Sequence, residues 1–355
     1  MKAEPGILSV MHLSTASEWR GGEQQLYYLF RQLEKKGIDQ WLVMPGGQAD
    51  QKMRDLGLKP KKLFFRQPWL LWDAFRIARF CDRNNIDILH AHDSKAHSLA
   101  VLSVTLFNCR SSIIAHRRVD NPIRQNLFTR WKYNHPSVRA VICISKKVLE
   151  ITADFLKHPQ KATLVYSAVD PPTEEMNHQG ELKKILGIPD TDKVIGNISA
   201  IDHHKDPFTF IKTAAALLKE RRDLSFVWIG TGNSDLIRDL KVLVDELGMQ
   251  GKIHFPGYID QAKKHLWDFD VFLFTSATEG LGTTVLDALI RKVPVVATAA
   301  GGVPELILHR ETGYLAEVGD ATGLKEGITT VLNDGALRAE MLRNGYRRAG
   351  EHFSP

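Results

Sequence analysis

The feature that most limits how this chain can fold is an alternation of strand-like and helix-like segments that occurs twice. The first set starts with a buried strand pattern at 7–14, ILSVMHLS, and a helical pattern at 26–37, LYYLFRQLEKKG. The second set begins at 193–201, KVIGNISAI. Strands that alternate with helices indicate parallel βαβ units. The sequence therefore predicts an α/β protein with two Rossmann-like parallel sheets.

The two sets are separated by a segment of different composition. Residues 168–192 carry the Pro171–Pro172 pair and an acidic, polar stretch, which is typical of a linker. With 355 residues, two domains are also the expectation from length. We expect a first domain at 1–168, a linker at 169–192 and a second domain at 193–355, facing each other across a cleft. Open α/β sheets bind ligands at the carboxyl ends of their strands.

Composition excludes several classes of protein. No apolar run reaches the roughly 18 residues that a membrane-spanning helix needs. Three widely spaced cysteines form neither a disulfide framework nor a zinc pattern, which favours a cytoplasmic location. Residues 1–170 carry 26 Lys and Arg against 15 Asp and Glu, or +11, whereas residues 171–355 carry 21 against 26, or −5. A basic first half is expected to face something anionic.

The most informative stretch is 275–305, TSATEGLGTTVLDALIRKVPVVATAAGGVPE. It follows a buried strand, so Glu279 and the two glycines after it lie in a strand-to-helix loop, and Thr283 or Thr284 is expected to cap the helix. Free N–H groups at the start of that helix suit a phosphate or diphosphate. Asp287, one turn into the helix, could accept hydrogen bonds from a ribose, and Glu279 from a sugar. Alternatively, these acids only complement the helix dipole.

These residues resemble a known family. EGLGTTVLDA followed by VPVVATAAGGVPE is similar to the E-x7-E segment and the GG-x-PE loop of glycosyltransferase family 4, a retaining group with the GT-B fold. WIGTGNSDLIRDLKVLVDELGMQGKIHFPGYID resembles the family's usual run before that motif. The sequence departs from the pattern at Asp287, where Glu is usual, and the resemblance covers nearly the whole chain.

The resemblance assigns donor-binding residues to the second domain. Lys205 corresponds to the lysine that holds the donor diphosphate, whereas Ala200 occupies the position of the usual arginine, for which His203, His204 or a basic residue of the first domain could substitute. Catalytic roles are implied for Lys205, Glu279 and His92. The residues implied in donor binding are Gly21, Gly22, Lys205, Gly230, Tyr258, Glu279, Gly280, Leu281, Gly282, Thr283, Thr284 and Asp287.

In the first domain, the resemblance implies a site for the acceptor. Gly21 and Gly22 match a glycine turn after the first strand, and His92, in HAHD, matches the family's active-site histidine. His90 is expected to be a buried partner of His92. His116, Arg117 and Arg118 are candidates for binding an anionic acceptor. The alternatives are a plain tight turn, a structural histidine and solvated surface charge.

The implied reaction is transfer of a sugar from a nucleotide donor, with retention, to a glycan or lipid-linked acceptor in bacterial cell-surface polysaccharide or lipopolysaccharide synthesis. UDP is favoured over GDP. No metal or other cofactor is expected, because no DxD-like segment stands in the expected place. Two alternatives remain: a GT-B nucleotide-sugar epimerase, and a non-catalytic sugar-nucleotide-binding relative. A nicotinamide oxidoreductase is a poorer match, because no G-x-G-x-x-G follows the first strand.

One stretch of the first half suggests a membrane surface. Residues 59–76, KPKKLFFRQPWLLWDAFR, combine basic and aromatic side chains as the headgroup layer favours. Alternatively, they form a strand and a core helix with a solvated flank. The first reading predicts peripheral contact with an anionic membrane on its cytoplasmic side, and nucleic acid is not expected as a partner. The family's last helix, which crosses back to the first domain, is expected to be missing after HFSP at the end of the chain.

Overall fold

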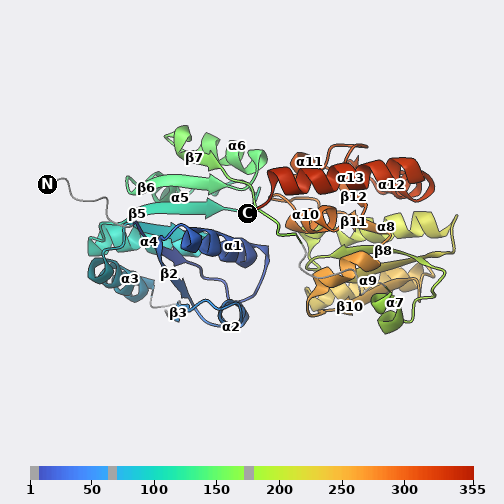
Figure 1. Cartoon of the computed structure of the whole chain (residues 1–355), viewed down its shortest axis with the longest axis horizontal. Coiled ribbons are helices and arrows are strands. Elements are labelled where there is room, and N and C mark those ends of the chain that lie inside the picture. The colour runs from blue at the N-terminus through green and yellow to red at the C-terminus, as the bar shows by residue number, and fades with distance from the viewer. Residues whose placement is uncertain (1–7, 63–69, 172–179) are drawn as a thin grey trace. The chain divides into compact units, whose positions relative to one another are not determined.

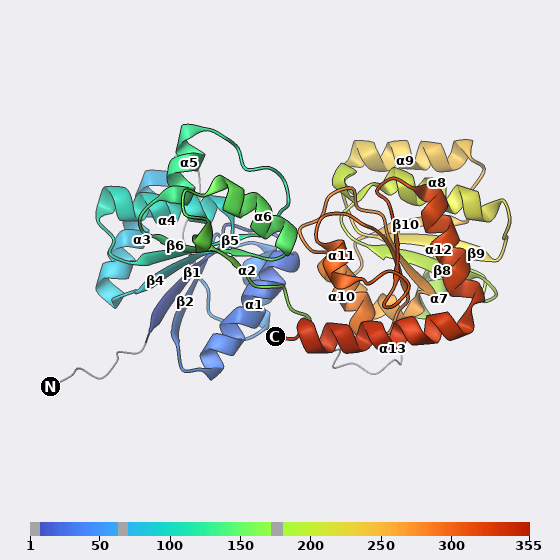
Figure 2. The same ribbon diagram turned by 90° about the horizontal axis from the view of Figure 1, so that it is seen from above.

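The computed structural model describes residues 8–62, 70–171 and 180–355 (Figure 1). The chain forms two compact units, one ending at Ser167 and the other spanning Ala168–Ser354. Each unit is a parallel sheet with helices packed on it (Figures 1 and 2). The prediction of two Rossmann-like parallel-sheet domains is therefore confirmed.

The first unit has a seven-stranded sheet in the order β3-β2-β1-β4-β5-β6-β7. The order runs outward in both directions from the pair β1 and β4, so the carboxyl ends of β1, β4 and β5 lie side by side. The strands are β1 (Ser9–Leu13), β2 (Asp39–Met44), β3 (Lys61–Lys62), β4 (Ile88–Ala91), β5 (Ser112–Arg117), β6 (Val138–Cys143) and β7 (Ala162–Leu164). The helices are α1 (Gly21–Lys35), α2 (Gln48–Asp55), α3 (Leu70–Asn84), α4 (Ser94–Phe107), α5 (Leu127–Asn134), α6 (Lys146–Phe155) and the 3-10 helix η1 (Pro159–Lys161).

The second unit has a six-stranded sheet in the order β10-β9-β8-β11-β12-β13. Its strands β9 and β11 are buried along their whole length, as expected where helices cover a parallel sheet. The strands are β8 (Lys193–Ile198), β9 (Leu224–Ile229), β10 (Ile253–Gly257), β11 (Val271–Phe274), β12 (Val295–Thr298) and β13 (Tyr314–Ala316). The helices are α7 (Glu181–Leu186), α8 (Pro207–Leu218), α9 (Ser234–Glu246), α10 (Thr283–Ile290), α11 (Val303–Leu306), α12 (Ala321–Asn333), α13 (Gly335–His352) and the 3-10 helices η2 (His203–Lys205) and η3 (Ala262–Asp268).

Aromatic side chains form the centre of the second unit's core. Trp228 on β9 is fully buried, and its ring lies 5.1 Å from that of Phe210 on α8 in an edge-on contact. Phe226 contacts Phe210 in the same way at 6.0 Å. Burial of these large rings helps to fix α8 on the sheet.

The predicted linker extends too far. Residues 180–192 fold onto the second unit: Leu182 of α7 is fully buried, and the Gly180 and Leu182 amides donate to the Asp268 carboxylate at 2.5 and 3.2 Å. This short helix was not predicted because its sequence is mostly polar. Leu182 is its one buried residue. At the other end of the interval, the Val169 amide donates to the carbonyl of Phe353, just after α13, at 2.7 Å. Among the described helices, none is long and apolar enough to cross a membrane.

Candidate functional site

The second unit brings Lys205 and Glu279 together at the carboxyl ends of neighbouring strands. Lys205 closes η2 after β8, Glu279 follows β11, and the Lys205 ammonium forms an ion pair with the Glu279 carboxylate. Each side chain keeps 16% of its surface exposed. Thr275 fixes the lysine loop, because its hydroxyl lies 3.0 Å from the carbonyls of Lys205 and Asp206. The Thr275 side chain therefore holds the backbone of the loop that carries Lys205.

The loop after Glu279 leads directly into α10. Gly282 is the N-cap with φ +93°, a left-handed conformation that favours glycine, and no side chain in the described residues caps this helix. The expected capping role of Thr283 or Thr284 is therefore wrong, because both already lie in the first helical turn. Leu281 is fully buried, so it presents no surface to a ligand. Thr283 and Thr284 at this helix start are partly exposed, and the N–H groups there suit an anion.

The loop between β12 and α11 supports Glu279 from the other side. The Gly302 amide donates to the carbonyl of Glu279 at 3.0 Å, which connects the GGVPE segment to the EGLG segment. The two motifs that carried the family resemblance are therefore adjacent in space. Gly280, the second residue of EGLG, is buried.

Asp287 lies beside two cations. Its carboxylate is 3% exposed and contacts Lys263 Nζ at 2.8 Å and Arg291 Nη1 at 3.6 Å. Arg291 could have been predicted as a partner of Asp287, because it follows Asp287 by four positions. Lys263, on η3, was missed because nothing in its local sequence points to a residue 24 positions away. A cation therefore lies close to the position expected to bind the ribose.

Backbone packing requires a glycine at position 230, which the sequence alone did not indicate. Its φ is +151°, and a Cβ there would lie 1.9 Å from the carbonyl oxygen of Ser199. A Cβ on Gly232 would meet the carbonyl oxygen of Ile201 at 1.8 Å. Close packing of two backbone segments therefore requires both glycines. Their presence carries no information about a ligand.

The remaining donor candidates lie on the surface. Tyr258 is 64% exposed, and its hydroxyl is 3.3 Å from the Asp260 carboxylate. Ala200 is exposed after β8, and His204 Nδ1 lies 3.1 Å from the Asp202 carboxylate. The usual arginine at position 200 is therefore replaced by a small side chain within an exposed polar turn.

In the first unit, four histidines cluster on neighbouring strands. His90 lies in β4 and His92 directly follows that strand, and their rings lie 4.3 Å apart. His116 of β5 and His12 of β1 contact both at 4.7 to 5.4 Å. The expectation that His90 is a buried partner of His92 is confirmed. His12 was missed, because a single histidine in an apolar strand resembles an ordinary core residue.

These imidazoles are held in their neutral form. Burial lowers the pKa of His12 to about 4, partly opposed by its hydrogen bond to Gln40. Burial also lowers the pKa values of His90, His92 and His116 well below the usual range. Nitrogen atoms of His12, His90 and His92 lie within 4.8 Å of one another, which is the one group of potential metal ligands found in the described residues. Metal independence stays a prediction.

Arg118 joins this cluster to the glycine turn. Its Nη2 lies 3.4 Å from His92 Nδ1, and its Cδ would be 3.6 Å from a Cβ on Gly22, the second residue of α1. Gly21 is the first residue of that helix. Burial lowers the pKa of Arg118 to about 10, so the guanidinium stays charged at neutral pH. Gly22, His92 and Arg118 therefore form one group, as expected for an acceptor site.

Arg117 belongs to a different environment. As the residue after His116 in β5, it points to the opposite face of the sheet. It is 8% exposed, and its guanidinium donates to the carbonyl of Asn121. Strand alternation therefore separates Arg117 from Arg118, and a contact of Arg117 with an anionic acceptor stays a prediction.

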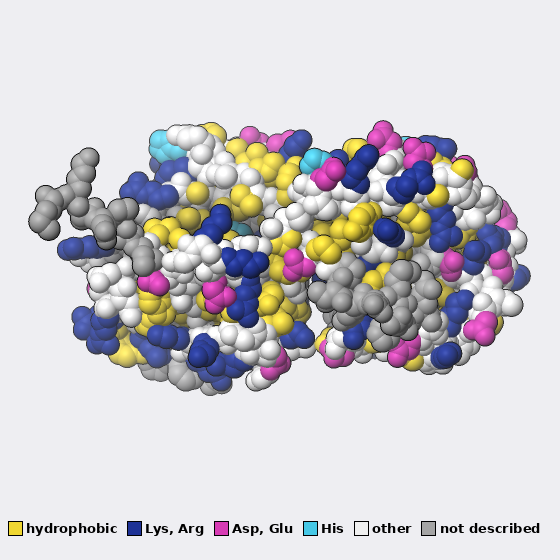
Figure 3. Space-filling model, viewed as in Figure 1, with side chains coloured by type: hydrophobic (Ala, Val, Ile, Leu, Met, Phe, Trp, Pro, Cys, Tyr) yellow, Lys and Arg dark blue, Asp and Glu magenta, His cyan; other side chains and the backbone are white. Residues whose placement is uncertain are grey.

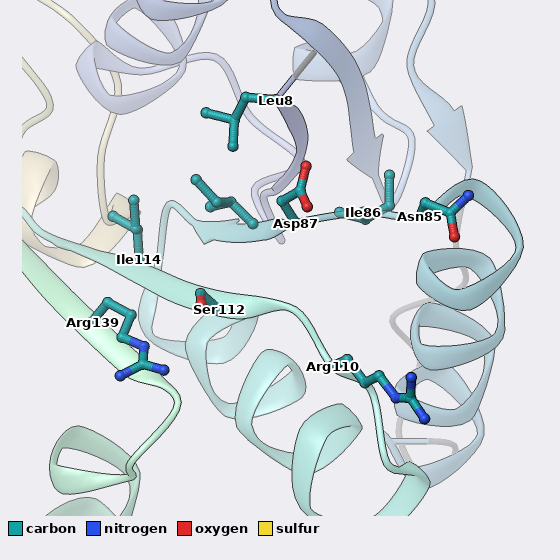
Figure 4. Close-up of a pocket in the computed structure, with 9 residues that line it drawn as sticks. Leu8, Asn85, Ile86, Asp87, Arg110, Ser112, Ile114 and Arg139 are labelled. Atoms are coloured by element: carbon teal, nitrogen blue, oxygen red, sulfur yellow. The ribbon is translucent and has the colours of Figure 1, made fainter. Parts of the chain in front are cut away.

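The described residues also line a hollow of about 620 Å³ at the opposite edge of the first sheet (Figure 4). It lies at the amino ends of β1, β4, β5 and β6, between Leu8, residues 85–88, Arg110, Ser112, Ile114 and Arg139. Asp87 in its wall already accepts a hydrogen bond from the Ser9 amide at 2.9 Å. The hollow contains none of the predicted site residues.

Basic side chains are prominent on the first unit. On the face in Figure 3, dark-blue Lys and Arg side chains cover much of this unit, with few carboxylates among them. This distribution agrees with the excess of 26 Lys and Arg over 15 Asp and Glu in residues 1–170.

Comparisons with known proteins match both units. Residues 19–172 match the family described as Glycosyltransferase Family 4, and residues 178–348 match Glycosyl transferases group 1. The chain is 27% identical over 299 residues to N-acetyl-alpha-D-glucosaminyl L-malate synthase of Bacillus anthracis, covering 82% of this chain and 77% of that protein. It is 21% identical over 336 residues to the lipopolysaccharide core biosynthesis glycosyltransferase LpsE of Rhizobium meliloti, covering 94% and 92%.

A solved structure has the same fold. The Anabaena protein Alr3699/HepE, crystallised with UDP and glucose, superposes with a TM-score of 0.84 at 18% identity, covering 98% of this chain and 96% of that one. The chain therefore has the GT-B fold.

Proposed function

Because this chain is a glycosyltransferase of family 4, we propose that it transfers a sugar from a UDP-sugar, with retention, to an anionic glycan or lipid-linked acceptor. The observation that carries the donor side is the Lys205–Glu279 pair beside the open start of α10. A cation and a row of helix N–H groups suit a diphosphate, and a carboxylate suits sugar hydroxyls. The structure solved with UDP and glucose shares this fold, which supports UDP over GDP.

Charge stabilisation is the main contribution of the second unit to the reaction. As the bond between the anomeric carbon and the diphosphate breaks, negative charge grows on the leaving phosphate. Lys205 and the amides at 282–284 lie where they can stabilise that charge. The acceptor oxygen bonds to the anomeric carbon from the same face, and its proton passes to the departing phosphate oxygen. No protein nucleophile is required, and no metal is expected.

The acceptor side of the proposal rests on Arg118. A buried guanidinium next to Gly22 and His92 is suited to a carboxylate or phosphate group. The relative from Bacillus anthracis is named for L-malate, a dicarboxylate, which is consistent with an anionic acceptor. LpsE is named for lipopolysaccharide core synthesis. We therefore favour an acidic acceptor from cell-surface polysaccharide or lipopolysaccharide synthesis.

A membrane-facing surface is part of the proposal. The aromatic run at 63–69 lies outside the described residues, but Leu71 and Trp72 of α3 are each 55% exposed. On α5, Leu127 is 87% exposed beside Phe128 and Trp131. Both helices contact α4. Apolar side chains among exposed arginines suit an anionic lipid surface, which would place the protein on the cytoplasmic face of the membrane.

The function is tested by incubating the protein with UDP- and GDP-sugars and acidic or neutral acceptors, then following products by mass spectrometry and NMR. We expect transfer from a UDP-sugar only, with the anomeric configuration retained. Conversion of the donor sugar without any acceptor would instead identify an epimerase. Donor binding with neither reaction, across lipid-linked and soluble acceptors, would contradict the proposal and favour a binding protein.

A further inference from the structure

The histidine cluster contains a line of hydrogen bonds whose direction is fixed at one end. Gln40 Nε2 donates to the carbonyl of Phe30 at 3.0 Å, and Gln40 Oε1 lies 3.0 Å from His12 Nε2. The amide cannot be turned over, because the Phe30 carbonyl accepts hydrogen bonds and never donates them. Gln40 Oε1 must therefore accept, and the proton of His12 must be on Nε2.

This assignment determines the next residue. His12 is neutral, because burial lowers its pKa to about 4, so its Nδ1 carries a lone pair. His92 Nε2 lies 3.0 Å from that atom and can only donate to it. The remaining nitrogen of His92, Nδ1, then carries a lone pair and faces Arg118 Nη2 at 3.4 Å. Arginine is a donor only, so the direction is consistent from Arg118 to the Phe30 carbonyl.

We propose that Gln40 and His12 are positioning residues that hold His92 as its Nε2–H tautomer and thereby orient the Arg118 guanidinium toward the acceptor. This inference rests on the proposed function, in which His92 and Arg118 meet the substrates. The Arg118 Nη2 is directed to His92. Its Nε is buried and has no hydrogen-bond partner in the described part of the chain, so it is an unsatisfied donor that an anionic group of the acceptor would satisfy.

Metal binding by His12, His90 and His92 is the competing explanation. Their nitrogens lie within 4.8 Å of one another, but a metal would need lone pairs on both His12 Nδ1 and His92 Nε2. The proton of His92 would then sit on Nδ1 and face an N–H group of Arg118. A divalent ion would also lie near a guanidinium, which is unfavourable in a buried site. The geometry therefore favours the hydrogen-bonded chain.

The direct test is the tautomer of His92 in the full-length protein labelled with ¹⁵N-histidine. Long-range ¹H–¹⁵N spectra identify which ring nitrogen carries the proton, and His12→Asn and His92→Asn assign the signals. We expect Nε2–H for both histidines in the natural sequence. An Nδ1–H tautomer of His92, or stoichiometric Zn²⁺ binding by calorimetry that His12→Leu abolishes, would overturn the proposal.

Two matched variants separate positioning from packing. His12→Leu removes the acceptor for His92, whereas His12→Asn keeps an oxygen close to the place of Nδ1. Losing one hydrogen bond of this kind predicts a fall of about 3- to 10-fold in kcat/KM for the acceptor with His12→Leu, and a much smaller fall with His12→Asn. The KM for the UDP-sugar should not change in either variant.

Gln40→Leu provides a second route if His12→Leu does not fold. Gln40 is half-buried, and its loss should populate both tautomers of His12 and weaken acceptor use in the same direction. Equal effects of Leu and Asn at position 12, with the His92 tautomer unchanged, would show a packing role only. The tautomer measurement needs no enzymatic activity. A correct tautomer without sugar transfer would therefore refute the proposed function while the hydrogen-bonded chain from Arg118 to Phe30 still stands.

Discussion

The Lys205–Glu279 pair predicts that two substitutions at one site change UDP affinity in opposite directions. In the free protein the Lys205 ammonium is bound to Glu279, and both side chains are 16% exposed. The diphosphate of UDP must compete with that carboxylate. Glu279→Gln removes the competitor while keeping the side-chain shape, so UDP should bind more tightly. Lys205→Met removes the cation, so UDP should bind more weakly.

The magnitudes follow from the burial of the pair. Exposed pairs contribute about 0–1 kcal/mol, and breaking a fully buried pair costs about 3–5 kcal/mol. A pair at this depth lies between these limits, so Glu279→Gln should tighten UDP by about 1–2 kcal/mol, or roughly 5- to 30-fold. Lys205→Met loses a charge-assisted hydrogen bond and should weaken UDP by about 1.5–3 kcal/mol, or roughly 10- to 150-fold.

Isothermal titration with UDP measures both changes, and the double variant tests the cause. If Glu279 acts through Lys205, Glu279→Gln should change UDP affinity by less than about twofold in the Lys205→Met background. Glu340→Gln, an exposed carboxylate on α13, is the control for loss of one negative charge. The reasoning is refuted if Glu279→Gln weakens UDP as much as Lys205→Met does. With the UDP-sugar, Glu279→Gln should lower kcat/KM, because the sugar loses its carboxylate partner.

Three further predictions concern other parts of the chain. Gly230→Ala should destabilise the second unit by about 3 kcal/mol or more in urea unfolding, because its Cβ would lie 1.9 Å from the Ser199 carbonyl oxygen. The control is Gly335→Ala, whose Cβ would meet nothing within 4 Å, and equal stability of both variants would contradict the packing argument. Burial lowers the pKa of His12 to about 4, whereas the pKa of an unfolded histidine is about 6.5. The stability that neutral His12 contributes is therefore fully present above the unfolded pKa and is lost as the pH falls toward 4. The free energy of unfolding should drop by about 3 kcal/mol across that window, and the drop should shrink in His12→Asn. Leu127→Glu with Phe128→Ser should reduce sedimentation with vesicles that contain anionic lipid, whereas Val242→Ser on α9 should not; unchanged sedimentation would exclude α5 as the contact.

The fold and half of the candidate site could be predicted because their signals are local. Alternating strands and helices determined the two sheets, and Glu279, Gly282 and Lys205 stand in short motifs that keep their spacing. Lys263 and His12 could not be found, because each acquires its role from residues far away in the sequence. Arg117 was grouped with Arg118 because they are neighbours in the chain, whereas a strand turns successive side chains to opposite faces. Gly230 was read as a ligand contact because a glycine does not reveal which backbone it must avoid.

Gly230 and Gly232 pack closely against the backbone of residues 199–201, which follow β8, and this packing determines how a side chain at position 200 is held. The Ser199 amide donates to the carbonyl of Ile229, and the Ile201 amide donates to the carbonyl of Thr231. Trp228 Nε1 donates to the Ser199 carbonyl at 3.0 Å. Ala200 is therefore an exposed residue between two clamped neighbours. An arginine introduced there would extend from an immobile base and would require no change in the main chain. Position 200 can therefore take the arginine that the family resemblance implies by exchange of one side chain alone.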